Sequence, residues 1–130
     1  MAVTGALVDT SVLIATESGR RVDASAIPDI VAISTVTLGE LRLGVLSVVD
    51  PEVLNTRLAT YTAALLFAPL AVDEAVANAW AQMQARLRAA GRRMPVNDSW
   101  IAAIALAHGL PLLTMDDDYD VVDGLEVVML

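Results

Sequence analysis

Four acidic residues lie where apolar segments of the sequence begin or end, at positions that a fold can bring together. They are Asp9, Glu40, Asp98 and Asp116. Asp9 ends a strand predicted at Ala6–Asp9, and Asp116 follows a strand predicted at Leu110–Thr114. In open α/β sheets, ligand sites form outside the carboxyl ends of the strands. We therefore expect these carboxylates to converge at one edge of a sheet.

Carboxylates gathered at such an edge repel one another, and this repulsion predicts a bound cation. At a separation of about 4 Å and an effective dielectric near 20, each pair costs about 4 kcal/mol. Either a cation binds among the carboxylates, or their pKa values rise until some are neutral. With no cysteine and one histidine in the chain, an oxygen-only site favours Mg²⁺, with Mn²⁺ as a substitute.

Each acid also has a purely structural interpretation. Asp9 and Asp98 both precede or open predicted helices, where a carboxylate caps backbone N–H groups. Thr37 and Glu40 have the spacing of a capping box, in which Glu40 would only bind a backbone N–H. The run Asp116–Asp120 could be a solvated turn. The residue types alone leave both interpretations open.

Short apolar segments alternate with amphipathic ones along the chain. Strands are predicted at Ala6–Asp9, Ile30–Ser34, Phe67–Val72, Leu110–Thr114 and Val127–Leu130. Helices are predicted at Thr10–Thr16, Thr35–Ser47, Asp50–Leu66 and Asp73–Ala90, followed by a helix that opens at Asp98 and ends at Gly109. This alternation predicts parallel strands joined by crossover helices. We expect one domain over residues 1–130, a three-layer α/β/α fold with a central, mainly parallel sheet.

The composition excludes several classes of protein. A hydrophobic content of 56% is high, but no apolar run is long enough for a membrane helix. Asp9 interrupts the first apolar segment, which argues against a signal peptide and favours a cytoplasmic protein. The surplus of apolar residues indicates a surface that a partner covers.

The net charge of −8 is unevenly distributed and argues against general affinity for nucleic acid. One dense basic cluster lies upstream of Asp98 and consists of Arg86, Arg88, Arg92 and Arg93. These arginines suit the carboxyl end of a solvated helix, and they are also candidate RNA contacts. Trp80, Trp100 and Tyr119 are predicted to pack rather than react.

Four segments of the chain resemble the motif blocks of PIN-domain nucleases, in the same order and spacing. They are VDTSVLIA at Val8–Ala15, ISTVTLGELRLG at Ile33–Gly44, VNDSWIAAIALAHG at Val96–Gly109 and LLTMDDDY at Leu112–Tyr119. The chain most resembles the VapC-type toxins of bacterial type II toxin–antitoxin pairs. The resemblance implies that Asp9, Glu40 and Asp98 are site acids. The fourth is Asp116 by preference, then Asp118, then Asp117.

The resemblance implies an Mg²⁺-dependent endoribonuclease that hydrolyses RNA phosphodiesters with metal-activated water. We expect Asp9 and Asp98 to be direct metal ligands, and Glu40 and Asp116 to hold metal-bound waters or a second ion. Residues expected to orient these carboxylates are Thr10, Ser11, Asn97 and Thr114.

The resemblance also implies a homodimer and a hetero-oligomer with a small antitoxin. A groove between the predicted helices Thr10–Thr16 and Asp50–Leu66 would receive an amphipathic antitoxin segment. An arginine on that segment would pair with the site carboxylates. A catalytically silent PIN-like binding module is the alternative. A metal phosphohydrolase is disfavoured, because the first strand ends in Asp9-Thr-Ser and the chain has no lysine.

Overall fold

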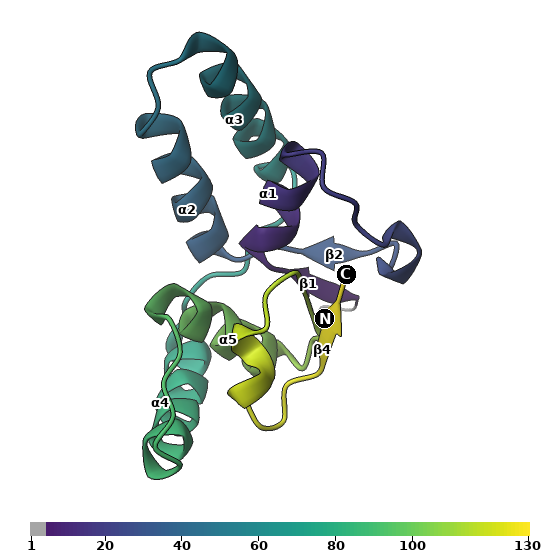
Figure 1. The fold of residues 1–130 in the computed structure, drawn as a ribbon. Coiled ribbons are helices and arrows are strands. Elements are labelled where there is room, and N and C mark those ends of the chain that lie inside the picture. The colour runs from purple at the N-terminus through teal and green to yellow at the C-terminus, as the bar shows by residue number, and fades with distance from the viewer. Residues whose placement is uncertain (1–4) are drawn as a thin grey trace.

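The computed structural model describes residues 5–130, so the first four residues of the predicted domain lie outside the described part. The strands are β1 Ala6–Val8, β2 Val31–Ala32, β3 Leu112–Thr114 and β4 Val127–Met129. The α-helices are α1 Thr10–Glu17, α2 Thr35–Leu46, α3 Pro51–Ala64, α4 Glu74–Ala89 and α5 Val96–His108. Two short 3₁₀ helices are η1 Ala24–Ala26 and η2 Asp118–Val121. Figure 1 shows their arrangement.

The four strands form one parallel sheet in the order β2-β1-β3-β4. Leu7 of the central strand β1 is paired with Ala32 on one side and Leu112 on the other. The backbone N–H of Asp9 donates to the carbonyl of Leu113 at 2.9 Å, so the pairing continues to the first acid. The carboxyl ends of β1 and β3 therefore lie side by side.

Helices cover both faces of this sheet, which confirms the predicted three-layer α/β fold. Along β1 the side chains alternate, as they must in a strand. Leu7 packs in one core cluster with the inner faces of α4 and α5. Ala6 and Val8 pack in a second cluster with α1, α2 and the end of α3. In Figure 1, α2 and α3 project together from the sheet as a hairpin, while α4 and α5 lie on the opposite side.

Helix α5 is the most deeply buried helix segment. Its residues from Ile101 to Ala105 have no exposed surface. Trp100 stacks on Trp80 of α4 with ring centroids 4.4 Å apart, which joins the two helices. Gly109 ends α5 in the left-handed conformation at φ 64°, which confirms the predicted glycine cap. This rigid packing fixes the direction in which the first turn of α5 points.

One predicted helix start differs in the structure, and the start predicted for α2 at Thr35 is confirmed. The helix predicted to open at Asp98 begins at Val96, directly after Pro95, so Asp98 lies in the first turn and is not the N-cap. The N-cap of α2 is Ser34, whose hydroxyl accepts the N–H of Thr37 at 2.9 Å. The capping-box interpretation of Thr37 and Glu40 therefore does not hold, because Thr37 lies inside the first turn and Ser34 is the N-cap.

The strand predicted at Phe67–Val72 is also wrong. This segment makes only an isolated parallel bridge, between Leu70 and Ser34. The N–H of Leu70 donates to the carbonyl of Ile33 at 2.9 Å, and the N–H of Thr35 donates to Leu70 at 3.0 Å. Pro69 has no N–H with which to continue such a ladder.

Helix α3 begins as predicted, with Asp50 as N-cap and Pro51 in the first turn. No helix within residues 5–130 combines the length and the apolar character needed to cross a bilayer.

Candidate functional site

The four predicted site acids line one cleft at the carboxyl edge of the sheet. Asp9 follows β1, Glu40 lies on α2, Asp98 on α5, and Asp116 follows β3. Together with neighbouring side chains they line a volume of about 280 Å³. The other lining residues are Thr10, Ser11, Ile14 and Arg20. The structure thus brings the acids together, and their roles stay predictions.

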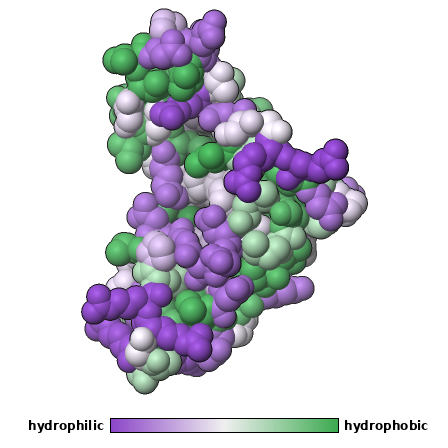
Figure 2. Space-filling model, in the orientation of Figure 1, coloured by the Kyte–Doolittle hydropathy of each residue, from purple (hydrophilic) through white to green (hydrophobic). Residues whose placement is uncertain are grey.

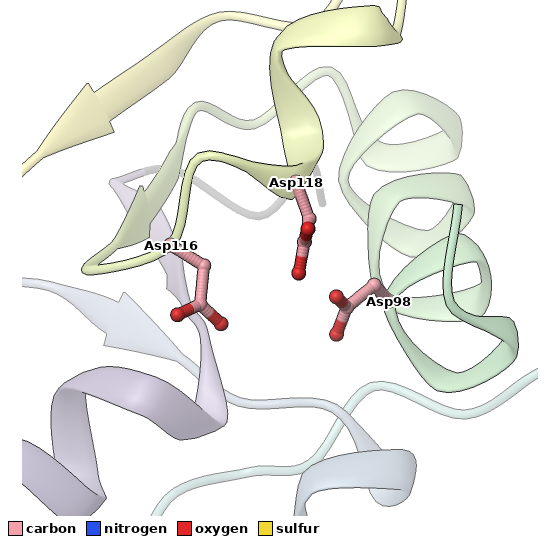
Figure 3. A group of neighbouring side chains, drawn as sticks. All are labelled: Asp98, Asp116 and Asp118. Atoms are coloured by element: carbon pink, nitrogen blue, oxygen red, sulfur yellow. The ribbon is translucent and has the colours of Figure 1, made fainter. Parts of the chain in front are cut away.

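Three carboxylates face a shared space across this edge. Asp98, Asp116 and Asp118 each offer an oxygen, and these oxygens lie within 4.8 Å of one another. Figure 3 shows Asp98 on its helix pointing toward the two acids of the segment after β3. An all-oxygen group of this kind fits a hard divalent cation such as Mg²⁺ or Mn²⁺. Asp117, the third alternative for the fourth acid, is exposed and belongs neither to this group nor to the cleft lining.

Asp9 is held differently, because three hydroxyl groups donate to its carboxylate. Ser11 donates to Oδ2 at 2.6 Å and Thr114 donates to the same oxygen at 2.8 Å. Tyr119 donates to Oδ1 at 2.9 Å. Asp9 is 1% exposed, so these bonds replace the water that a buried carboxylate loses. A carboxylate has about four acceptor positions, and one remains to face the cleft.

Ser11 and Thr114 also fix the backbone that carries Asp116. The Ser11 hydroxyl accepts the N–H of Met115 at 3.0 Å, and the Thr114 hydroxyl accepts the N–H of Asp116 at 3.0 Å. These two residues therefore connect the ends of β1 and β3. Asn97 does not join them: its side chain is exposed and hydrogen-bonds to no acid in the described part of the chain.

Glu40 is tied to α1 by a chain of hydroxyl groups. The Thr10 hydroxyl donates to Glu40 Oε1 at 2.8 Å and lies 2.9 Å from Thr37 Oγ1. The Ser34 hydroxyl in turn donates to Thr37 Oγ1 at 3.1 Å. The cap of α2 and the start of α1 thereby hold one oxygen of Glu40, while Glu40 also lines the cleft.

Burial and mutual repulsion raise the pKa values of the cleft acids. Burial, then the nearby Asp9 and Asp118 carboxylates, raises the pKa of Asp98 to about 7. Burial and the same two carboxylates raise the pKa of Asp116, and Arg20 opposes that rise. Such shifts mean that negative charge in this cleft is incompletely compensated by the protein. A bound divalent cation would supply the missing charge.

Tyr119 and Arg20 are site residues that the sequence analysis missed. Tyr119 packs as predicted, with no exposed surface, but its hydroxyl also holds Asp9. Burial and the nearby acids raise the pKa of Tyr119 well above its ordinary value, so the phenol keeps its proton. A buried tyrosine needs a partner for its hydroxyl, which is the signal that could have found it. Arg20 lies in a predicted loop, and no pattern in the sequence marks it.

The four arginines predicted as RNA contacts do not line the acid cleft. They are exposed around the end of α4 and the loop after it. Arg86 and Arg92 line one hollow there, and Arg88, Arg92 and Arg93 line another.

Comparison with known proteins identifies the fold and the motifs. Residues 6–125 match the family model of the PIN domain. The chain belongs to the PIN domain family. It is 51% identical to ribonuclease VapC4 of Mycobacterium tuberculosis (strain ATCC 25618 / H37Rv), over 98% of both chains. It is also 47% identical to ribonuclease VapC5 of that organism, over 91% of this chain and 87% of the relative.

A solved structure agrees with the sequence relatives. A member of the VapBC family of toxin–antitoxin systems, VapBC-5 from Mycobacterium tuberculosis, superposes with a TM-score of 0.89 at 39% identity. The match covers 96% of this chain and 98% of the other. The predicted resemblance to the VapC-type PIN-domain proteins is confirmed.

The hydrogen bond from Tyr119 to Asp9 predicts a measurable loss of stability in Tyr119→Phe. The ring still fills its place, but Asp9 loses a donor, and a bond to a charged group contributes about 1.5–3 kcal/mol. We expect the midpoint of urea unfolding to fall, with the slope of the transition unchanged. Tyr61→Phe is the matched control, since Tyr61 is only partly buried. Equal loss of stability in the two variants would contradict a special role for the Tyr119 hydroxyl.

The raised pKa of Asp98 predicts how the stability of the metal-free protein depends on pH. The pKa is about 7 in the folded chain, against 3.8 as the ordinary value. The folded state therefore binds the proton more tightly, and this contribution to stability is lost as pH rises toward 7. In EDTA, Asp98→Asn should raise the melting temperature at pH 8, and by much less at pH 5.

Adding Mn²⁺ at pH 8 should reverse this order if the ion binds at Asp98, because binding would stabilise the wild type and the variant lacks that carboxylate. The exposed Asp29→Asn is the control and should match the wild type under all three conditions. A melting temperature of Asp98→Asn below the wild type in EDTA at pH 8 would rule out the electrostatic explanation.

Proposed function

We propose that this chain is an Mg²⁺-dependent endoribonuclease that acts as the toxin of a toxin–antitoxin pair, with Mn²⁺ as a substitute ion. The convergence of Asp98, Asp116 and Asp118 carries the proposal. Support comes from the relatives named as VapC ribonucleases and from the similarity to VapBC-5, a toxin–antitoxin system.

The carboxylates of Asp98, Asp116 and Asp118 would hold the ion, with the remaining acceptor position of Asp9 beside them. When bound, the ion supplies Lewis acidity that lowers the pKa of an attacking water and stabilises charge on the phosphodiester. The chain itself orients these ligands: Ser11, Thr114 and Tyr119 hold Asp9, and Thr114 also holds the backbone of Asp116. Partners of this kind fix the direction of a ligand oxygen.

Arg20 and Glu40 have roles on the substrate side of the cleft. Arg20 is the one basic side chain among the described residues that line it. Its guanidinium group matches two oxygens of a phosphate, so it would fix the scissile phosphodiester. Glu40 Oε1 is occupied by the Thr10 hydroxyl, which leaves Oε2 to accept a hydrogen bond from the attacking water.

The proposed antitoxin would bind beside the acids, in a groove between α1, α2 and α3. A hollow of about 180 Å³ there is lined by Ile14, Leu41, Gly44 and Arg57 and shares Glu40 with the acid cleft. Large apolar side chains are exposed on these helices and directly after α3, namely Ile14, Leu43, Leu46, Leu58, Leu65 and Leu66. An amphipathic antitoxin segment would cover part of this surface and place an arginine against the carboxylates, and a second copy of the chain would cover the rest.

The function is tested by RNA cleavage with matched aspartate variants. Purified chain in Mg²⁺ or Mn²⁺ should cut total RNA into discrete fragments, and EDTA should abolish the fragments. Asp98→Asn, Asp116→Asn and Asp118→Asn should each lower the rate about a hundredfold or more, beyond the range seen for partners of metal ligands. Asp117→Asn makes the same change of charge in the same segment and should retain activity.

Circular dichroism would establish that the variants are folded. Folded wild-type protein that cleaves nothing with either metal would favour the catalytically silent binding module. Loss of activity in Asp117→Asn equal to that in Asp118→Asn would contradict the assignment of the metal ligands.

The groove is tested by an exposed apolar residue within it. Ile14→Lys should abolish copurification of the co-expressed cognate antitoxin, because a cation then stands where apolar contact is expected. Val49→Lys is the control, since Val49 is 97% exposed and does not line this hollow. Retention of the antitoxin by Ile14→Lys, or a wild-type chain that runs as a monomer and binds no antitoxin, would contradict the proposed partner surface.

A further inference from the structure

A basic hollow outside the acid cleft lies between the end of α4 and the start of α5. Its volume is about 670 Å³. Arg88, Arg92 and Arg93 line it together with Trp80, Gln84 and Met94, and none of its described lining residues is acidic. Three of the eight arginines of a chain with net charge −8 therefore gather in one place. Figure 2 shows strongly hydrophilic surface over this end of α4.

The turn after α4 fixes these arginines relative to one another. The N–H of Gly91, at φ 69°, donates to the carbonyl of Arg88 at 3.0 Å, and the N–H of Arg92 donates to Leu87 at 2.8 Å. Arg88 lies on the last turn of α4, where a cation suits the helix dipole. Arg92 and Arg93 lie beyond the end of α4, in the loop that leads to α5. The helix dipole therefore does not explain why cations lie at these two positions. The backbone presents all three around one space.

Trp80 gives the hollow a fixed aromatic wall. One face of its indole is covered by Trp100, with the rings 5° from parallel. Its Nε1 donates to the Ser99 hydroxyl at 2.9 Å, which fixes the ring within its plane. The surface of the ring that remains lines the hollow beside the arginines. Cations beside an immobilised indole are the combination that binds single-stranded nucleic acid, through phosphate contacts and base stacking.

The hollow and the acid cleft open on opposite sides of the same helical turn. Val96 lines the hollow and Asp98 lines the cleft. Two residues along an α-helix are separated by about 200° around its axis and about 3 Å along it. A single strand that crosses the first turn of α5 would therefore reach both places.

We propose that this hollow, formed by Arg88, Arg92, Arg93 and Trp80, binds single-stranded RNA next to the segment that is cut. The proposal rests on the ribonuclease function proposed above and deepens it. The arginines neutralise phosphates, and the indole stacks on a base. An acidic peptide would use the arginines but would gain nothing from the aromatic wall, so RNA is the occupant that fits both features.

Tryptophan fluorescence measures this binding directly, because Trp80 and Trp100 are the only tryptophans in the chain. The full chain in EDTA, titrated with unstructured oligouridylate, should show quenching without cleavage. The variant Arg88→Gln/Arg93→Gln should bind about tenfold more weakly. Its slope of log K against log salt should be shallower by about 1.4, since each phosphate contact with a single strand contributes about 0.7.

Arg21→Gln/Arg42→Gln is the matched control. Both arginines are exposed and line neither the hollow nor the cleft. Each double variant loses two positive charges, so the net charge changes equally, from −8 to −10. Affinity of Arg88→Gln/Arg93→Gln equal to that of this control would overturn the proposal. Competition by polyglutamate as strong as that by oligouridylate would also overturn it, in favour of an acidic protein segment.

Cleavage separates this proposal from the proposed catalytic function. Arg88→Gln/Arg93→Gln should cut a uridine dinucleotide at the wild-type rate and raise the KM for long RNA about tenfold. Equal loss on both substrates would show that the arginines affect the cleavage step itself and would overturn the proposal. The protein could instead show quenching by oligouridylate that depends on Arg88 and Arg93 but no metal-dependent cleavage. That result would refute the catalytic function and support the RNA site.

Discussion

Repulsion among buried carboxylates is the constraint on which the rest of this structure depends. Asp9 is buried at the end of the central strand, and Asp98 and Asp116 face the same cleft. Three hydroxyl groups stabilise the carboxylate of Asp9. Burial and neighbouring carboxylates raise the pKa values of the other two acids. Natural proteins accept destabilising interactions of this kind at functional sites and compensate for them elsewhere in the structure. If the strands and helices that carry these acids could move, repulsion would push the carboxylates apart. These elements must therefore be held rigidly.

The fold supplies that rigidity through parallel pairing and a deeply buried helix. Asp9 and Asp116 follow neighbouring strands whose hydrogen bonds continue to the backbone of Asp9. Asp98 is carried by α5, whose central residues have no exposed surface and which ends at a fixed glycine cap. Because the middle of α5 is packed so closely, its first turn cannot move away from the sheet without opening the core. The same packing that stabilises the domain therefore holds the acids against their repulsion.

Much of this arrangement follows from the sequence, and the part that does not has physical causes. Strand ends fix the positions of Asp9 and Asp116, and the apolar periodicity of α5 places Asp98 in its first turn to within two residues. The sequence ranked Asp118 above Asp117 only through the resemblance, because which of them points into the cleft depends on where the 3₁₀ helix begins. The hydroxyl of Tyr119 was missed because its ring alone explains a buried tyrosine. Arg20 reaches the cleft through the path of a loop, which no periodicity describes.

The charge distribution links the binding of the two ligands that the proposed function requires, the metal ion and RNA. RNA is a polyanion, and the segment from residue 116 to residue 126 carries six acids and no base. Without a cation, the cleft repels a phosphodiester that Arg20 alone attracts. With a divalent ion among Asp98, Asp116 and Asp118, the local charge becomes less negative by two. By linkage, an ion that favours RNA binding must itself be bound more tightly when RNA is present. On the proposed function, the acidic chain would repel nucleic acid except where a bound metal ion or the clustered arginines reverse the sign of its electrostatic potential.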